Sequence, residues 1–176
     1  MEERTFILGA LVENEFGVLT RVAGMFARRG YNIDSLTVGP TEDPKISRMT
    51  IKSKGDDYIK GQITKQLMKL NDVKQVVVLS DEPSVTRELM LIKVAAPQER
   101  HAEIMEAVKV YRSKVVDLCA NALTIEITGE VSKLDAFIEY MRPYGIAELT
   151  RTGATTIQRG EARLVDSEEY LERGAV

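Results

Sequence analysis

Along residues 1–80, hydrophobic positions recur at the spacing of either a strand or a helix, and this pattern predicts six elements. Thr5–Val12 is almost wholly apolar, which is typical of a central strand covered on both faces. From Val18 onward apolar residues recur at helical spacing, and Gly30 is placed to end that helix. The pattern then predicts strands at Tyr31–Gly39 and 48–52, a helix capped by Asp56 or Asp57, and a strand at Val73–Leu79.

The second half of the chain repeats this order of elements. Strands are predicted at Glu88–Ala95, 114–118, 123–128 and 146–151, with helices at Gln98–Arg112 and after a cap formed by Ser132 and Asp135. Residues 81–87 are polar and contain a proline, so they are expected to link two domains, residues 1–80 and 88–160. Residues 161–176 form a charged tail with a frayed end, in which Ser167–Arg173 is at most a short helix.

Each half reads β-α-β-β-α-β, which predicts an α+β protein of two tandem ferredoxin-like domains. In this fold an antiparallel sheet has both helices on one face. The strand order is 4-1-3-2, so the strand that begins at Tyr31 is expected at an edge of its sheet. An unpaired edge is a ready surface for pairing with another chain.

Composition narrows the class of protein. The chain has 176 residues, 44% of them hydrophobic, and a net charge of −3; residues 1–85 balance 12 basic against 12 acidic side chains. No basic block is present, and the predicted central strands lack displayed aromatics, so neither DNA nor RNA is expected as a partner. The first apolar strand is too short for a signal sequence or a membrane span. We therefore expect a cytoplasmic protein without a membrane partner.

Side chains able to catalyse a reaction are sparse. The only histidine, His101, lies among polar neighbours, and Cys119 has no base beside it, so we expect a solvated imidazole and a buried or neutral thiol. A single cysteine excludes an internal disulfide and a CxxC metal pair. No glycine-rich nucleotide motif is present, and the carboxylates are scattered. The sequence therefore favours binding over catalysis.

The most informative segment joins the first strand to the first helix. Glu13-Asn14-Glu15-Phe16 is a short polar turn, and Gly17 opens directly into the helix at Val18. Such a junction presents unpaired backbone N–H groups at the positive end of a helix dipole. A small anion, such as the carboxylate of an amino acid, is the ligand that this arrangement suits.

Several segments together resemble the small, regulatory subunits of acetohydroxyacid (acetolactate) synthase. They are residues 12–22, 29–38, 40–44, 47–51 and 133–137, within a similarity that covers residues 4–160. The family consists of an N-terminal ACT domain and a second, ACT-like domain. The resemblance implies a subunit that is not an enzyme on its own, activates the thiamine-diphosphate-dependent catalytic subunit and confers feedback inhibition by valine.

The resemblance also implies partners and cofactors. The catalytic subunit of this transferase is expected to carry thiamine diphosphate, magnesium and FAD, and this chain none. The ACT domain is expected to form a homodimer and to bind valine or a related branched-chain amino acid. A methylene separates these amino acids by only ~1–3 kcal/mol, so the sequence leaves their ranking open.

An effector site follows from the family motif and the dimer. The helix from Val18 to Arg29 spans about 18 Å, so Asn14 and Asn32 lie at its opposite ends within one chain. Antiparallel pairing of the edge strands would bring Asn32 of one chain toward Asn14 of the other. The predicted effector-binding residues are Asn14, Gly17, Val18, Leu19, Asn32, Ile33 and Leu11. The alternative is that the asparagines and the glycine only form turns or cap a strand.

Two other functions remain open from the sequence. One is a stand-alone amino-acid-sensing ACT protein that controls another enzyme or a transcription factor, although no helix–turn–helix segment is evident. The other is an enzyme acting alone, which the missing nucleophile–base arrangement disfavours.

Overall fold

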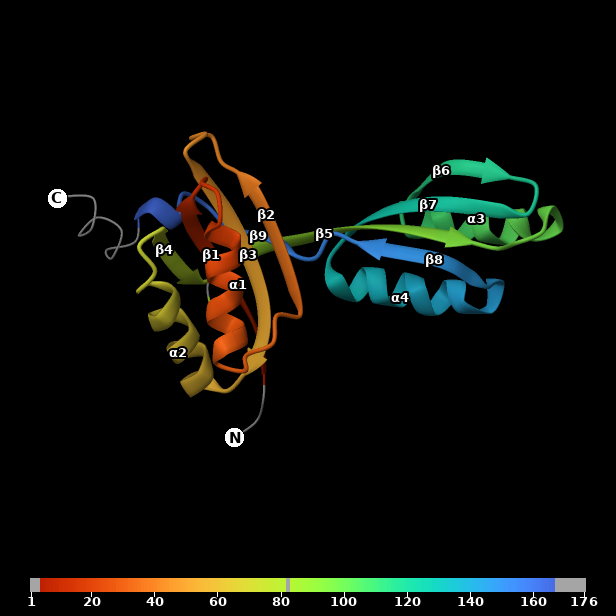
Figure 1. The fold of residues 1–176 in the computed structure, drawn as a ribbon. Coiled ribbons are helices and arrows are strands. Elements are labelled where there is room, and N and C mark those ends of the chain that lie inside the picture. The colour runs from red at the N-terminus through yellow and green to blue at the C-terminus, as the bar shows by residue number, and fades with distance from the viewer. Residues whose placement is uncertain (1–3, 82, 167–176) are drawn as a thin grey trace. The chain divides into compact units, whose positions relative to one another are not determined.

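The computed structural model describes residues 4–81 and 83–166, which form two compact units (Figure 1). One unit takes its described residues from Met1–Val85 and Ala154–Val176, and the other is Thr86–Gly153. Both units have the β-α-β-β-α-β order, an antiparallel sheet and helices covering one face of that sheet. The predicted α+β class with two tandem ferredoxin-like domains is therefore confirmed.

The first unit has the strand order β2-β3-β1-β4, so β2 is an edge strand as predicted. The central strand β1 pairs with β3 from Arg4↔Gly55 to Glu13↔Ile46. The main elements are β1 (Arg4–Glu13), α1 (Val18–Arg28), β2 (Ser35–Pro40), β3 (Ile46–Gly55), α2 (Asp57–Leu67) and β4 (Val73–Val78). Strand β2 begins at Ser35 and not at Tyr31, because Tyr31 and Ile33 pack against the core instead of extending the sheet.

Alternation along β1 divides its side chains between the two faces of the sheet. Phe6, Leu8, Ala10 and Val12 face α1 and α2 and are buried with the apolar residues of both helices. The helix ends follow the sequence. The Asp56 side chain accepts a hydrogen bond from the Ile59 N–H at 2.8 Å, which confirms that cap, and Gly30 ends α1 with a φ of +69°.

The other face of this sheet is covered by the segment that follows the second unit. Leu11 packs there against Leu79 and Leu164, and all three are buried. A side chain at Gly9 would meet the Leu79 Cδ1 at 2.7 Å and the Leu164 Cδ1 at 3.2 Å, so glycine permits this close approach. Strand β9 (Thr155–Gln158) pairs with β5, and the short 3₁₀ segments η1 (Leu79–Asp81) and η4 (Leu164–Asp166) complete the cover.

The second unit has the strand order β6-β7-β5-β8, and its core lies between this sheet and its two helices. The expected cap by Ser132 and Asp135 is wrong: α4 begins at Val131, and Asp135 accepts a hydrogen bond from Arg151 Nη1 at 2.7 Å. Cys119 was expected to be a buried or neutral thiol; it is exposed, so the buried alternative is wrong. The elements are β5 (Ser84–Val94), α3 (His101–Val110), β6 (Lys114–Cys119), β7 (Ala122–Gly129), α4 (Val131–Met141) and β8 (Ile146–Arg151), with 3₁₀ segments η2 (Gln98–Arg100) and η3 (Arg142–Tyr144).

The division of the chain differs from the expected one at both ends of the second domain. The expected linker, residues 81–87, overlaps the start of β5, because the alternating residues from Ser84 onward join a strand. Residues from Ala154 group with the first unit, although the sequence pattern assigns residues up to 160 to the second domain. The segment Ser167–Arg173 lies outside the described residues. Within the described residues, no helix is long and apolar enough to cross a membrane.

Candidate functional site

The turn between β1 and α1 has the geometry that the sequence predicts. β1 ends at Glu13, and α1 begins at Val18 directly after Gly17. Gly17 has a φ of +83°, in the left-handed region that a residue with a Cβ adopts only at a cost. We call residues 14–20 the glycine turn; its conformation depends on having glycine at position 17.

Several backbone donors of the glycine turn point out of the helix unused. No side chain caps α1. Within the described residues, the N–H groups of Gly17, Leu19 and Thr20 have no acceptor, and the Val18 N–H reaches the Glu15 carbonyl only at 3.5 Å. These groups lie at the positive end of the helix dipole. The turn can therefore bind a small anion.

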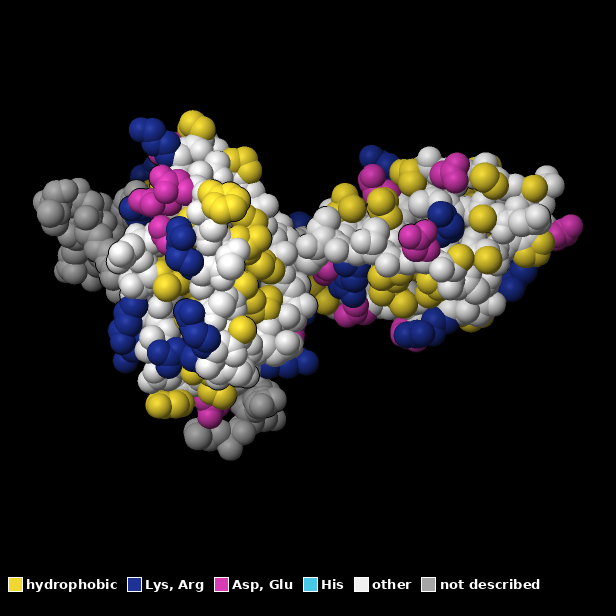
Figure 2. All heavy atoms as spheres, in the orientation of Figure 1, with side chains coloured by type: hydrophobic (Ala, Val, Ile, Leu, Met, Phe, Trp, Pro, Cys, Tyr) yellow, Lys and Arg dark blue, Asp and Glu magenta, His cyan; other side chains and the backbone are white. Residues whose placement is uncertain are grey.

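The Arg21 side chain lies beside the same turn, and its charge is paired with Asp72. Its Nη1 lies 3.2 Å from the point where a Gly17 Cβ would be, and its Nε forms an ion pair with Asp72. The helix itself carries Arg21 and Arg28 and no acidic residue. Figure 2 shows Lys and Arg side chains over the face formed by α1 and α2. An anionic ligand at the glycine turn is thus attracted by the helix dipole, and the Arg21 guanidinium lies close enough to donate a further hydrogen bond from Nη1.

Two apolar side chains flank these donors and are exposed. Phe16 is fully exposed, and Leu19 is 46% exposed. Large apolar side chains left in water beside polar groups are typical of binding surfaces. Sequence reasoning included Leu19 but missed Phe16 and Arg21. The sequence did contain a signal that Arg21 belongs to the site: it lies four residues after Gly17 and therefore on the same side of the helix.

Asn14 is part of the turn, but its amide already has partners. Nδ2 donates to the Pro44 carbonyl at 2.9 Å, and Oδ1 accepts from Ser47 Oγ at 3.0 Å. The Asn14 N–H also donates to the Lys45 carbonyl at 2.7 Å. Asn14 therefore holds the β2–β3 loop against the glycine turn, and one amide hydrogen of Nδ2 remains for a ligand.

Asn32 and Ile33 lie at the opposite end of α1 from the turn. The Asn32 carbonyl accepts from Ser53 Oγ at 2.6 Å, and its Nδ2 donates to Asp34 Oδ1 at 2.7 Å. Ser47 and Ser53, the contacts of the two asparagines, are six residues apart on β3, or about 20 Å at 3.4 Å per residue. One chain therefore does not bring Asn14 and Asn32 together.

Leu11 also lies away from the turn residues. It is on the face of the sheet opposite α1, where it is 5% exposed and packs against Leu79 and Leu164. The structure thus brings together Asn14, Gly17, Val18 and Leu19, and it separates Asn32, Ile33 and Leu11 from them.

Groups able to perform chemistry do not gather in the described residues. No group of three or more His, Cys, Asp or Glu side chains that could hold a metal ion occurs among residues 4–81 and 83–166. His101 Nε2 lies 3.1 Å from the Ala96 carbonyl and so already has a backbone partner. The Cys119 thiol, at the end of β6, lies 3.9 Å from Asp117 Oδ2.

Comparison with known proteins decides the family. A family model described as "AHAS small subunit-like ACT domain" matches residues 8–75, and one described as "Small subunit of acetolactate synthase" matches residues 87–160. The chain belongs to the acetolactate synthase small-subunit family. The resemblance noted from the motifs is thereby confirmed, and the first unit contains an ACT domain.

Individual relatives agree over nearly the whole chain. A probable acetolactate synthase small subunit of Methanothermobacter thermautotrophicus is 51% identical over 161 residues, which cover 91% of this chain and 96% of that protein. The isozyme 3 small subunit of Salmonella typhimurium is 43% identical, covering 88% and 96%. The crystal structure of the Thermotoga maritima small subunit has a TM-score of 0.83 and 41% identity, covering 90% of this chain and 99% of that one.

Proposed function

We propose that this chain is the regulatory, non-catalytic subunit of an acetolactate synthase. It activates the thiamine-diphosphate-dependent catalytic subunit and confers feedback inhibition by a branched-chain amino acid, valine in the first instance. Family membership supports the partnership with a catalytic subunit. The observation that carries the sensing role is the glycine turn, where unpaired N–H groups, Arg21 and exposed apolar side chains lie together.

The chemistry of valine matches this turn group by group. Its carboxylate would accept hydrogen bonds from the N–H groups of Gly17 and Leu19, with the helix end contributing about 0.3–2 kcal/mol. Its isopropyl group would pack on Phe16 and Leu19, and burial of a valine side chain is worth roughly 1.5–3 kcal/mol. The free Nδ2 hydrogen of Asn14 would orient the carboxylate.

A homodimer would complete the site. Strand β2 is an edge, and antiparallel pairing of two β2 strands is isologous, so it generates two equivalent sites. The partner subunit's Asn32 would then approach the glycine turn from the other side. This arrangement would explain why the family motif includes two asparagines that lie at opposite ends of α1 in one chain.

Valine would act by binding one arrangement of the paired subunits more tightly than another. A ligand with equal affinity for both arrangements does not shift the equilibrium between them. The catalytic partner would hold thiamine diphosphate, magnesium and FAD, and the complex would work in the cytoplasm. This chain would supply no group to the bond-making steps.

Reconstitution tests the proposal directly. The purified chain is added to a purified acetolactate synthase catalytic subunit, and acetolactate formation from pyruvate is measured with and without valine. The proposal predicts a higher rate in the presence of the chain and inhibition by valine only when the chain is present. Valine binding to the chain without any effect on the catalytic subunit would instead favour a stand-alone amino-acid sensor.

A further inference from the structure

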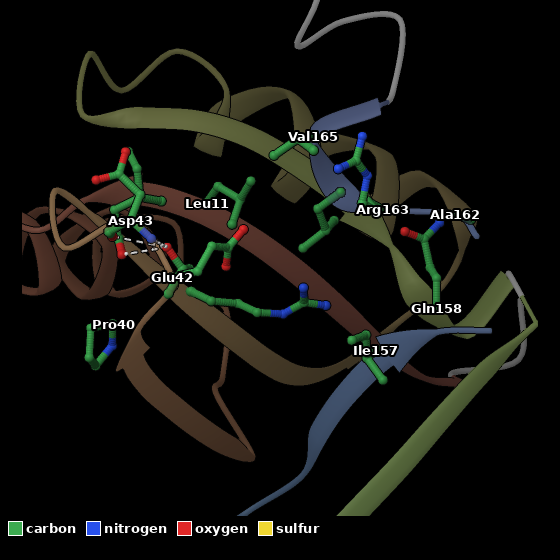
Figure 3. Close-up of a pocket in the computed structure, with 13 residues that line it drawn as sticks. Leu11, Pro40, Glu42, Asp43, Ile157, Gln158, Ala162, Arg163 and Val165 are labelled. Atoms are coloured by element: carbon green, nitrogen blue, oxygen red, sulfur yellow. Dashed lines mark hydrogen bonds between the residues drawn. The ribbon is translucent and has the colours of Figure 1, made fainter. Parts of the chain in front are cut away.

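A pocket lies on the face of the first unit's sheet opposite α1 and α2. Its volume is about 470 Å³, within the range of small-molecule sites. It lies between the β2–β3 loop and the segment after β9, so residues distant in sequence build it together. In Figure 3 the labelled side chains of Leu11, Glu42, Ile157 and Arg163 surround one open space.

Arg48 is the unusual group in this pocket. Its guanidinium is half-buried and donates from Nη2 to the Thr156 carbonyl at 2.8 Å. Within the described residues no carboxylate lies within 4 Å of it, although a guanidinium carries five N–H donors. Burial lowers the pKa of Arg48, and the more distant charge of Glu42 raises it. A half-buried cation without an ion-pair partner is costly and attracts an anion.

Among the charged groups of the pocket, Arg48 is the one available to bind an anion. Arg163 is bound by Asp166 through two hydrogen bonds, of 2.8 Å and 2.7 Å, so its charge is compensated. Asp43 accepts a hydrogen bond from the Lys45 N–H at 2.9 Å. Glu42 is exposed, and no hydrogen bond or ion pair engages its carboxylate among the described residues.

The remaining walls are apolar. Leu11 and Leu164 are buried beneath the pocket, Val165 is partly buried, and Ile157 is 58% exposed at the rim. A cavity with aliphatic walls and a guanidinium that no carboxylate of the described residues contacts fits a carboxylate on a short aliphatic chain.

We propose that this pocket is a second ligand site, which binds a small branched aliphatic carboxylate with its carboxylate on Arg48 and its alkyl group against Ile157 and Leu11. Glu42 stands where an α-ammonium group would be neutralised, so an amino acid fits better than the corresponding 2-oxo acid. The site is separate from the glycine turn, which lies across the sheet, and it does not depend on a dimer.

Calorimetric titration of the full chain separates the two sites. The Gly17→Asp variant removes binding at the glycine turn, and the residual binding of L-valine, its 2-oxo acid and isobutylamine is then measured. We expect valine to bind more tightly than the 2-oxo acid, and isobutylamine, which lacks a carboxylate, not to bind. In the same background Arg48→Gln is expected to weaken valine binding at least tenfold, whereas the matched Arg28→Gln, on α1, leaves it unchanged.

A second variant and an NMR measurement test the site independently, in case Arg48→Gln disrupts the fold. Ile157→Ala trims an exposed side chain and is expected to weaken valine binding several-fold with the same thermal unfolding temperature as the parent. Addition of valine to the ¹⁵N-labelled Gly17→Asp chain is expected to shift the amide signals of Arg48 and Ile157. Absence of residual binding after Gly17→Asp, or equal residual affinity in Arg48→Gln and Arg28→Gln, would overturn the second site. If Gly17→Asp alters nothing while Arg48→Gln removes binding, the glycine-turn site fails and the second site stands.

Discussion

A left-handed glycine sets the geometry at the entrance to α1. With a φ of +83°, Gly17 turns the chain so that the following N–H groups face solvent, and it leaves the space beside Arg21 Nη1 open. Any side chain at this position meets the guanidinium at 3.2 Å and adopts an unfavourable backbone conformation.

Substitution of this glycine tests the binding role of the turn. We predict that Gly17→Asp abolishes valine binding to the turn, because a carboxylate there fills the space, pairs with Arg21 and repels the carboxylate of the ligand. Gly17→Ala shares the backbone strain of about 1–2 kcal/mol but adds no charge, so it should retain more affinity. Isothermal titration of both variants with valine measures the difference, and equal loss in the two would mean that backbone conformation alone explains the effect.

Arg151 and Glu88 form the most buried ion pair described in the second unit. Arg151 contacts Glu88 through two hydrogen bonds, of 2.8 Å and 2.7 Å, and also binds Asp135; Glu88 is 6% exposed. The hydrogen bonds that Arg151 donates to Glu88, and then the one it donates to Asp135, raise the pKa of Arg151 despite its partial burial. Glu88 is the buried member of the pair, so loss of Arg151 leaves its carboxylate buried without the guanidinium.

Arg151→Met should therefore lower the free energy of unfolding by about 3 kcal/mol, since Glu88 stays buried without its partner. Arg142→Met is the matched control, because Arg142 pairs with Glu139 on the surface and its loss should change stability little. Urea denaturation followed by circular dichroism gives both values. Equal effects of the two substitutions would show that the buried pair contributes no more than a surface one.

For single residues, the sequence predicted that the turn would bind an anion more successfully than it predicted which residues form the site. Gly17 and the helix start at Val18 were predictable because glycine and helical periodicity are local signals. Leu11 was assigned to the ligand because it is close in sequence, yet alternation along β1 turns it to the other face. Phe16 and Arg21 were missed because exposure is a property of the folded surface.

At the level of elements, β2 is the edge strand through which we propose that two chains pair. β2 pairs with β3 on one side only, and Val38 on this strand is 45% exposed. An exposed apolar side chain on an edge strand favours pairing with another chain, whereas lysine at an edge blocks it.

We accordingly predict that Val38→Lys weakens the homodimer at least tenfold, measured by sedimentation equilibrium. Val110→Lys, on an exposed position of α3 in the other unit, serves as the control and should leave the dimer intact. Identical dimerisation constants for both variants would place the interface away from β2.

The segment after the second unit acts as a covering element. Leu164 is 3% exposed and packs with Leu11 and Leu79 over the face of the sheet that the helices leave open. Leu164→Ala should cost about 2–5 kcal/mol of the first unit's stability, as large-to-small substitutions in cores do. Val110→Ala, at a 76% exposed position, should cost far less. Chemical denaturation compares the two, and a similar small loss in both would mean that the cover contributes no stability.

Element order and strand order were predictable from periodicity, whereas two boundaries were not. The Asp56 cap followed from residue type, but the cap expected at Ser132 failed because Asp135 binds Arg151, a residue 16 positions away. Residues 154–160 were assigned to the second domain and residues 161–166 to the charged tail, because nothing local shows that Leu164 completes a core begun by Leu11.

At the scale of the whole molecule, the chain passes between its two units twice, once within β5 and once after Gly153. The first unit therefore carries the glycine turn, the free edge and the Arg48 pocket together, each on a different part of one sheet and its helices. The family could be predicted from the sequence because its motifs are contiguous. The Arg48 pocket could not be predicted, because residues from both ends of the chain form its walls.

If the glycine turn is the sensing site, valine inhibits the catalytic partner only through this chain. Valine inhibition of acetolactate synthesis is measured with the catalytic subunit alone, with the wild-type chain and with the Gly17→Asp chain. We expect inhibition with the wild-type chain only, together with activation by both chains. Valine inhibition of the catalytic subunit alone, or undiminished inhibition with Gly17→Asp, would contradict this expectation.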